Sequence, residues 1–435
     1  MLALFGFLTI VVFLALIISR RLSVLLALIL VPLVFAIAAG IGAREIGDMI
    51  VAGIGKVAPT GIMLIFAVLY FALMIDTGLF DPMISMIVRI VQGDPLKITV
   101  GTALLTMLVH LDGDGTATFM IVISALLPLY RRIGMQPLIL PCIVALSAGV
   151  MHLVPWSGTM ARALNVMQCD ASQLLTPVLP AMAGGIVWVL LVAFWLGKKE
   201  RKRIGIVAID YEHGSELTEA QWRIRRPRLL WVNFALTLAL IVSLVMAWLP
   251  APVLFILGFA VALLLNYPSH MEQRDRLAAH ASNAFFVSLM IFAAGVFSGI
   301  LAGSGMIDAM AHSLVTLLPQ EHAAWLPALT ALSSMPLSLV FTPDAYYFGV
   351  LPVLKEAAVH YGLPPFDVGR AAILGQMTVG FPLSPLTAST FVLVGLSEVE
   401  LSDHQRFSFL YAWGTTLVMT LVALLIGAIY FPLFH

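Results

Sequence analysis

The sequence predicts an all-α protein that crosses a membrane many times. Of its 435 residues, 61% are hydrophobic and only 11% are charged, and the mean hydropathy is +1.03. So little charge cannot cover a water-soluble globule, whereas apolar runs of about 20 residues match the hydrocarbon core of a bilayer. Polar clusters interrupt these runs at corresponding places in two halves of the chain, which indicates an internal duplication.

Hydropathy predicts about ten membrane-crossing helices. They are expected near residues 2–19, 22–40, 59–76, 135–168, 173–197, 229–249, 251–267, 283–302, 366–396 and 408–432. The first run has no basic segment before it and no small-residue cleavage site after it, so we expect a retained helix and not a signal peptide. The two cysteines, Cys142 and Cys169, are too few for a disulfide framework and lack metal-ligand spacing.

Two further apolar stretches, 98–130 and 323–360, each have a polar cluster at the centre. The arms of the first are about 12 to 14 residues long, or ~20 Å, which is too short for a hydrocarbon core of ~30 Å. We therefore expect two re-entrant helical hairpins whose tips lie near the midplane of the membrane. The amphipathic stretches 81–91 and 306–318 precede the hairpins and are expected to lie along the interface.

The basic residues set the expected topology. With the N-terminus outside, 18 of the 23 Lys and Arg residues fall on the cytoplasmic side, as the positive-inside rule requires. This places both termini outside, and makes the first hairpin enter from the cytoplasm and the second from the outside. The long polar segment 198–228 then becomes a cytoplasmic linker, whose basic runs are expected to anchor the chain and not to bind nucleic acid.

The two halves, 1–197 and 229–435, share one order of features. In each, a hairpin is followed by a long helix broken by Pro, Ser and Thr: 135–168 at 154–159, and 366–396 at 381–387. Because the two hairpins open to opposite sides, the repeats are predicted to be inverted. Inverted repeats with broken helices are typical of secondary transporters that bind substrate at the midplane.

The four interruptions supply the candidate substrate-binding residues. Helix N-termini at 116, 157–159, 345 and 384–385 would present N–H groups and positive dipole ends, which favours an anionic, carboxylate-bearing substrate. Glycines allow close approach of backbone, and hydroxyls offer hydrogen bonds. The predicted residues are Asp112, Gly113, Asp114, Gly115, Thr116, Thr118, Ser157, Gly158, Thr159, Thr342, Asp344, Ser384 and Thr387.

Three aspartates conflict with a plain anion site, because carboxylates repel one another. The conflict disappears if a proton or a divalent metal ion travels with the substrate, since Asp can accept the waters that Mg²⁺ retains. The candidates for proton coupling are Asp112, Asp114, Asp344, His110 and His152. No resident metal site and no cofactor are expected. Arg162 could attract a carboxylate, but we expect it to extend to the outer interface.

Three segments carry specific motifs: DGDGTATFMIVISALLP (112–128), TPDAYYFGVLPVL (342–354), and FPLSPLTASTFVLVGL with the following VELSDHQRF (381–407). They resemble the CitMHS family of bacterial citrate–metal:proton symporters, which belongs to the ion transporter superfamily. The resemblance covers nearly the whole chain and is weakest in the first 50 residues and in 198–228. It implies proton-driven symport of citrate complexed with Mg²⁺ or Ca²⁺ across the inner membrane, and no enzymatic activity.

The related divalent anion:sodium symporters are homodimers, with a scaffold domain and a mobile transport domain that moves as an elevator. They carry Ser-Asn-Thr at each hairpin tip, where that motif helps to bind sodium and carboxylate. The positions that look equivalent here are 114–116 (Asp-Gly-Thr) and 343–345 (Pro-Asp-Ala). Neither is Ser-Asn-Thr, which favours protons over sodium as the coupling ion.

Other functions remain open from the sequence. One alternative is a sodium-coupled di- or tricarboxylate transporter. An intramembrane aspartyl protease would need Asp114 and Asp344 to meet, but its GxGD arrangement is absent and broken helices serve it no purpose. An ion channel would need a continuous pore, which hairpins from opposite sides do not provide.

Overall fold

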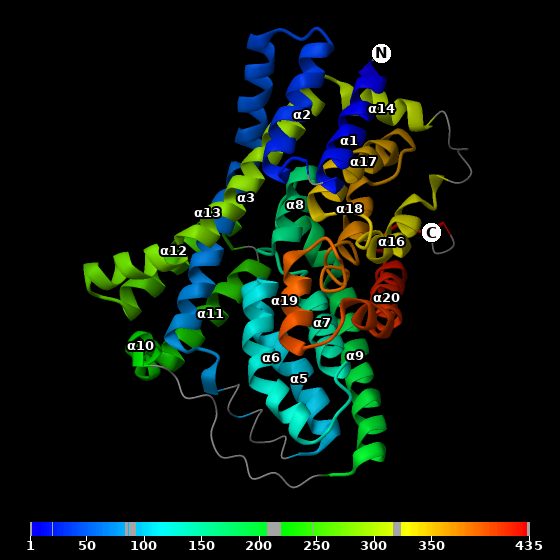
Figure 1. Cartoon of the computed structure of the whole chain (residues 1–435). Helices are drawn as coiled ribbons and strands as arrows, with labels where there is room; N and C mark the ends of the chain where they lie inside the picture. Colours follow the sequence, from blue (N-terminus) through cyan, green and yellow to red (C-terminus); the bar gives the residue numbers. More distant parts are fainter. Residues whose placement is uncertain are drawn as a thin grey trace.

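The computed structural model describes residues 2–19, 21–82, 86, 93–206, 219–246, 248–315 and 323–432, and all the regular secondary structure in these ranges is helical (Figure 1). The predicted interfacial stretch 81–91 lies mostly outside these residues, and 306–318 partly so. In the first half the helices are α1 (Leu2–Ile18), α2 (Val24–Ala38), α3 (Ala43–Thr77), α5 (Pro95–Val109), η1 (His110–Asp112), α6 (Gly115–Arg132), α7 (Ile139–Met151), α8 (Gly158–Met167) and α9 (Ala171–Ile204).

The linker and the second half contain α10 (Glu219–Ile224), η2 (Pro227–Leu229), α11 (Leu230–Val245), α12 (Ala251–Asn266), α13 (His270–Gly303), α14 (Met306–Val315), α16 (Leu326–Leu337), η3 (Ala345–Val350), α17 (Leu351–His360), α18 (Pro365–Ile373), α19 (Ala388–Ser397) and α20 (Leu401–Leu425). Five of the described helices are long and apolar enough to cross a membrane. They are Ala43–Thr77, Ala171–Ile204, Pro227–Leu244, Ala284–Gly303 and Leu401–Leu425.

One group of helices is built around the crossing of α3 and α13 (Figure 1). These helices have 35 and 34 residues. The part of α13 that is apolar enough to cross a membrane, Ala284–Gly303, matches the predicted span 283–302, whereas α3 meets that criterion over Ala43–Thr77 and so extends beyond the predicted 59–76. Residues 270–282 at the start of α13 are largely polar, so hydropathy does not include them in the span. α12 packs on α3, and α2 packs on α13. Farther out, α1 packs on α2 and α11 packs on α12.

A second group contains the interrupted segments. α5 packs against α7 and α9, and α16 packs against α18 and α20 in the same way. α6 of the first hairpin contacts α19, and α17 of the second hairpin contacts α8. The second arm of each hairpin therefore lies beside a broken helix from the other half of the chain, whereas the first arm packs within its own half.

Three details differ from the sequence prediction. The arms of the first hairpin have 15 and 18 residues and so are longer than expected, because α5 starts at Pro95, capped by Asp94, and α6 runs to Arg132. The second arm of the second hairpin begins as a π-helix, Ala345–Val350. The break in the last broken helix spans residues 374–387, about twice the expected length.

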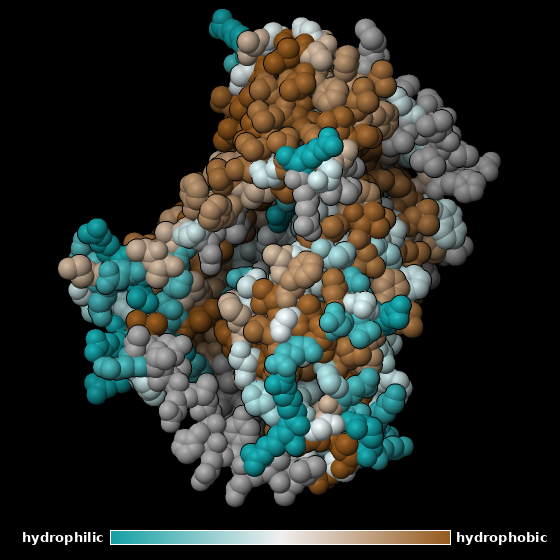
Figure 2. All heavy atoms as spheres, in the orientation of Figure 1, coloured by the Kyte–Doolittle hydropathy of each residue, from teal (hydrophilic) through white to brown (hydrophobic). Residues whose placement is uncertain are grey.

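Hydrophobic and hydrophilic surfaces are separated in the molecule. Figure 2 shows hydrophobic side chains over most of the upper part of one face, with hydrophilic side chains gathered beside α10 and toward the lower end. The lower end includes the basic stretch 198–203 at the end of α9, which is exposed apart from Glu200 and Ile204 nearby. A belt of apolar surface with a basic end fits a multi-pass membrane protein.

The α3–α13 crossing generates a prediction. A Cβ at Gly53 would lie 2.1 Å from the Gly295 carbonyl oxygen and 2.7 Å from Gly299 Cα, whereas a Cβ at Gly55 would meet nothing within 4 Å. We expect Gly53→Ala to lower the stability by about 1–3 kcal/mol through overpacking, and Gly55→Ala not to lower it. Thermal unfolding of the detergent-purified protein checks this, and equal unfolding temperatures for the two variants would contradict it.

Candidate functional site

The tip of the first hairpin is folded by its own aspartates. Asp112 Oδ1 accepts a hydrogen bond from the Asp114 N–H at 2.9 Å, and Asp114 Oδ1 accepts one from the Thr116 N–H at 2.9 Å. Asp114 is thus the N-cap of α6, and Gly113 between the two carboxylates has a φ of 76°, which favours glycine. The tip places Asp112 in the interior and leaves Asp114 exposed.

A hydrogen-bonded path leads from this tip to the first helix break. His110 Nδ1 lies 2.9 Å from Thr118 Oγ1, and His110 Nε2 lies 3.0 Å from His152 Nδ1. Thr118 Oγ1 also lies 3.5 Å from Asp112 Oδ1, and all four residues are buried. A hydrogen bond between two ring nitrogens requires that one carries the proton and the other accepts it. Two of the predicted coupling residues therefore share a proton position.

The first break, residues 152–157, packs directly on the tip. Trp156 Nε1 donates to the Leu111 carbonyl oxygen at 2.7 Å, and Ser157 Oγ caps α8 by accepting from the Met160 N–H at 3.1 Å. A Cβ at Gly113 would lie 3.2 Å from Trp156 Cδ1 and 3.5 Å from Ser157 Cα. A side chain at Gly113 would separate the tip from the break.

The second break reaches the same place through Phe381. Its ring lies over His110 and His152, with centroids 6.0 and 4.5 Å apart. A Cβ at Gly115 would lie 2.6 Å from Phe381 Cε2, so the start of α6 depends on a glycine there. In addition, the Thr159 hydroxyl of α8 donates to the Met377 carbonyl oxygen at 2.8 Å. Nothing in the sequence pattern indicates these contacts in advance.

The tip of the second hairpin joins the second break. Tyr347 donates from its hydroxyl to the Gln376 carbonyl oxygen at 2.9 Å, and the Ser384 hydroxyl donates to the Ser338 carbonyl oxygen at 2.6 Å. Thr342 Oγ1 accepts from the Ala345 N–H at 3.2 Å. The four predicted interruptions therefore meet in one place.

Arg162 links the second tip to the first break. Its Nε lies 2.7 Å from Asp344 Oδ1, and one terminal guanidinium nitrogen donates to the Gly158 carbonyl oxygen at 2.8 Å. The two side chains are only 18% and 8% exposed. The expectation that Arg162 extends to the outer interface is therefore wrong: the Asp344 carboxylate holds it inside the protein.

Two predicted hydroxyls serve the fold of the second break. The expectation that Ser384 starts a helix is wrong, because α19 begins at Ala388, after the N-cap Thr387. The Thr387 hydroxyl donates to the Phe381 carbonyl oxygen at 2.8 Å and lies 2.7 Å from Thr390 Oγ1. The Thr387 hydroxyl thus satisfies groups of its own segment, whereas the Ser384 hydroxyl joins the second break to the second hairpin.

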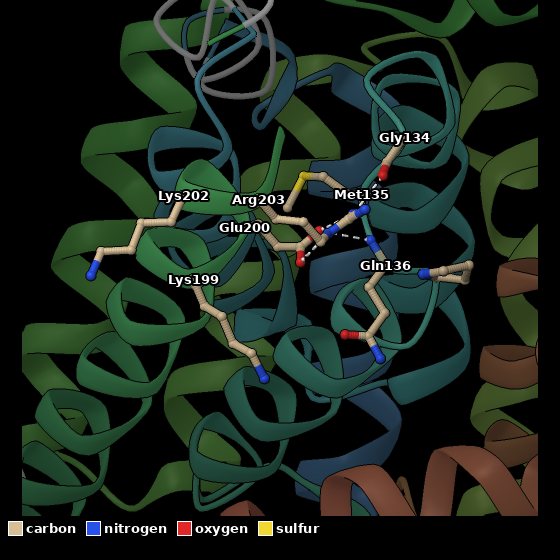
Figure 3. A pocket seen from close by; sticks show the side chains of 8 residues that line it. Gly134, Met135, Gln136, Lys199, Glu200, Lys202 and Arg203 are labelled. Carbon is tan, nitrogen blue, oxygen red and sulfur yellow. Dashed lines mark hydrogen bonds and ion pairs between the residues drawn. The ribbon is translucent and has the colours of Figure 1, made fainter. Parts of the chain in front are cut away.

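A pocket of about 700 Å³ lies away from these residues, between the turn that follows α6 and the end of α9 (Figure 3). None of the predicted site residues lines it. The Glu200 carboxylate accepts from the Gln136 N–H and from Arg203, while Lys199 and Lys202 point away from this pair. The pocket belongs to the basic end of the molecule. Within the described ranges, no group of three His, Cys, Asp or Glu side chains is arranged to hold a metal ion.

Comparison with known proteins identifies the family. The CitMHS family, described as citrate transporter, matches residues 10–380. The chain belongs to the CitMHS family. It is 53% identical over 431 residues to a citrate transporter of Bacillus subtilis (strain 168), covering 99% of this chain and 100% of that protein. It is 49% identical over 433 residues to the Mg²⁺/citrate complex secondary transporter of the same organism, covering 99% of each.

The fold is also similar to a solved transporter. The crystal structure of the Alcanivorax borkumensis YdaH transporter superposes with a TM-score of 0.59 over 89% of each chain, at 14% sequence identity. The all-helical membrane fold and the family resemblance expected from the sequence are confirmed.

The role of Ser384 can be tested separately from binding. Ser384→Ala leaves the buried Ser338 carbonyl oxygen without this donor, so we expect a loss of stability of about 1–3 kcal/mol with citrate affinity unchanged. Ser333→Ala is the matched control, since its hydroxyl donates to carbonyl oxygens one turn earlier in the same helix, α16. Thermal unfolding and citrate binding of both variants measure this. If Ser384→Ala lost affinity for citrate but kept wild-type stability, Ser384 would be a binding residue and this prediction would be contradicted.

Proposed function

We propose that the protein is a secondary active transporter that moves citrate, as a complex with Mg²⁺ or Ca²⁺, together with protons across the bacterial inner membrane. The observation that carries the proposal is the convergence of the four interruptions, which gathers Asp112, Asp114, Asp344, Arg162 and the His110–His152 pair. The relatives named above, one of them a Mg²⁺/citrate complex transporter, support the choice of substrate.

The charges at the first tip suit a metal complex better than free citrate. Asp112 and Asp114 lie two residues apart with no basic side chain bonded to either in the described part of the chain. Free citrate would be repelled there, whereas Mg²⁺ bound to citrate keeps waters that these carboxylates can accept. The metal is therefore part of the cargo, and no resident metal or cofactor is proposed.

Proton coupling is proposed to use the path from Asp112 through Thr118 and His110 to His152. A relay of this kind needs groups that can exchange a proton with a neighbour, and each member lies within 3.5 Å of the next. Sodium coupling is the alternative. The lack of Ser-Asn-Thr at 114–116 and 343–345 disfavours it.

The helix pairing supports two inverted repeats, 1–197 and 229–435, joined by a cytoplasmic linker at 198–228. α5 with α7 and α9 corresponds to α16 with α18 and α20, and α6 beside α19 corresponds to α17 beside α8. We propose an elevator-type homodimer with both termini outside. The scaffold would comprise the helices near 2–76 and 229–302, and the transport domain the hairpins, the broken helices, α9 and α20.

Uptake by proteoliposomes tests the function. We expect labelled citrate to accumulate against its gradient when Mg²⁺ or Ca²⁺ is present and an inward proton gradient is imposed, and expect a chelator to abolish uptake. A sodium gradient at constant pH should give no stimulation. Accumulation that needs sodium would select the alternative, and no citrate uptake under any condition would contradict the proposal.

The coupling residue is tested by Asp112→Asn, which keeps the size of the side chain and removes its titration. We expect this variant to lose accumulation driven by a pH gradient while it retains citrate exchange at equal pH. Asp170→Asn, at the cap of α9, is the control and should behave as wild type. Wild-type accumulation by Asp112→Asn would exclude Asp112 as the proton carrier, and Asp114 and Asp344 would be tested next.

The motion is tested by a cross-link between the second hairpin and α1. A Cβ at Gly349 would lie 3.4 Å from Ile10 Cγ2, so cysteines at these positions suit a short thiol reagent. In a background without Cys142 and Cys169, we expect this cross-link to stop transport and to leave binding intact. A cross-link between cysteines at Gly61 and Phe292, within the scaffold, should permit transport. Transport at the uncross-linked rate with the first pair joined would contradict an elevator.

A further inference from the structure

We propose that Arg162 is the binding residue for a carboxylate of the substrate, and that Asp344 occupies it as an internal substitute until the substrate arrives. The inference rests on the proposed function and adds which residue holds the anionic end of the cargo. It also gives the second hairpin a role, because Asp344 lies at its tip and release of Asp344 would remove one of the contacts that join this hairpin to α8.

The geometry around Arg162 resembles a carboxylate-binding site that is already filled. The Asp344 carboxylate engages Nε at 2.7 Å, while a terminal nitrogen is fixed by the Gly158 carbonyl oxygen. A guanidinium has five N–H donors in a planar fork, so further donors remain for a second acceptor. The fork is therefore oriented by the break itself, and its partner is a carboxylate supplied by a different half of the chain.

Buried polar groups without partners occur in the segments that carry this pair and in the second break. Three of them can donate a hydrogen bond: Nδ2 of Asn165, Nε2 of Gln376 and the hydroxyl of Tyr346. Asn165 follows Arg162 by three residues on α8, Tyr346 follows Asp344 by two, and the Gln376 carbonyl accepts from Tyr347. Buried donors are rarely left unsatisfied in a folded protein. A ligand with several carboxylates and a hydroxyl would supply the missing acceptors.

The opposite pole of the site is acidic. The first tip carries Asp112 and Asp114, and it reaches Arg162 through adjoining contacts, since Gly113 packs on Ser157 and the next residue, Gly158, binds Arg162. A metal–citrate complex has a cationic end and an anionic end. Its metal would face the first tip and its free carboxylate would face Arg162, which orients the cargo between the two hairpins.

Two variants that break the same ion pair should therefore change the affinity for the substrate in opposite directions. Arg162→Gln removes the ligand of the substrate, whereas Asp344→Asn removes its competitor. We expect Mg²⁺–citrate to bind Arg162→Gln about tenfold or more weakly, since hydrogen bonds between charged groups are the strong ones. We expect Asp344→Asn to bind it more tightly than wild type, by a few-fold or more.

The experiment measures binding of labelled citrate in excess Mg²⁺ to the detergent-purified full chain. The set comprises wild type, Arg162→Gln, Asp344→Asn, the double variant and Arg162→Lys, with thermal unfolding of each unliganded protein recorded alongside. Stability should follow the pairing of charges, so both single variants lose stability and the double variant regains part of it. Affinity should depend on whether Arg162 is present, so the double variant should bind as weakly as Arg162→Gln. The affinity of Arg162→Lys should lie between those of wild type and Arg162→Gln.

Arg131→Gln is the matched control, because it breaks another Arg–carboxylate pair, with Glu398, that joins a hairpin arm to a broken helix on the surface. Its affinity should equal that of wild type. If Arg162→Gln and Asp344→Asn weaken binding alike, the pair is structural and the inference is overturned. If Arg162→Gln binds citrate with wild-type affinity, the inference is also overturned. Wild type that binds no citrate contradicts the proposed function itself, which separates the two failures.

Discussion

Every backbone group freed where a helix stops at membrane depth must find a partner inside the protein. No water is present in the bilayer core to accept or donate a hydrogen bond. Here the partners come from the other interrupted segments: Trp156 donates to the Leu111 carbonyl, Thr159 to that of Met377, and Tyr347 to that of Gln376. The four interruptions are thus stable only together, and this requirement brings them to one place.

The same requirement explains the chemistry of the site. Ser157, Ser384 and Thr387, which the sequence offers as ligands, are used to complete the broken backbone. We propose that the charged groups and the unpartnered amides hold the cargo. The proposed site would then be a set of opposite charges held in position by hydroxyls and glycines, and the distribution of charge would set its selectivity.

The sequence predicts the positions of the breaks better than it predicts which residues satisfy the backbone groups there. Gly113, Asp114 and Pro343 interrupt apolar stretches, and local turn chemistry is enough to locate both tips. Residues 374–380 lie within the predicted helix 366–396 but are irregular, and Tyr347 and Thr159 donate hydrogen bonds to two of their carbonyl oxygens. Such partners lie far away in sequence. Arg162 was misjudged for the same reason, since its partner Asp344 is 182 residues away.

A structure of the full chain with Mg²⁺ and citrate bound tests the central claim most directly. The account predicts density for the cargo that touches residues of both hairpin tips, 112–118 and 342–346, or residues of both 155–159 and 382–387 at the two breaks. Such density would require the two halves of the chain to build one site. Density confined to residues of a single half would contradict it.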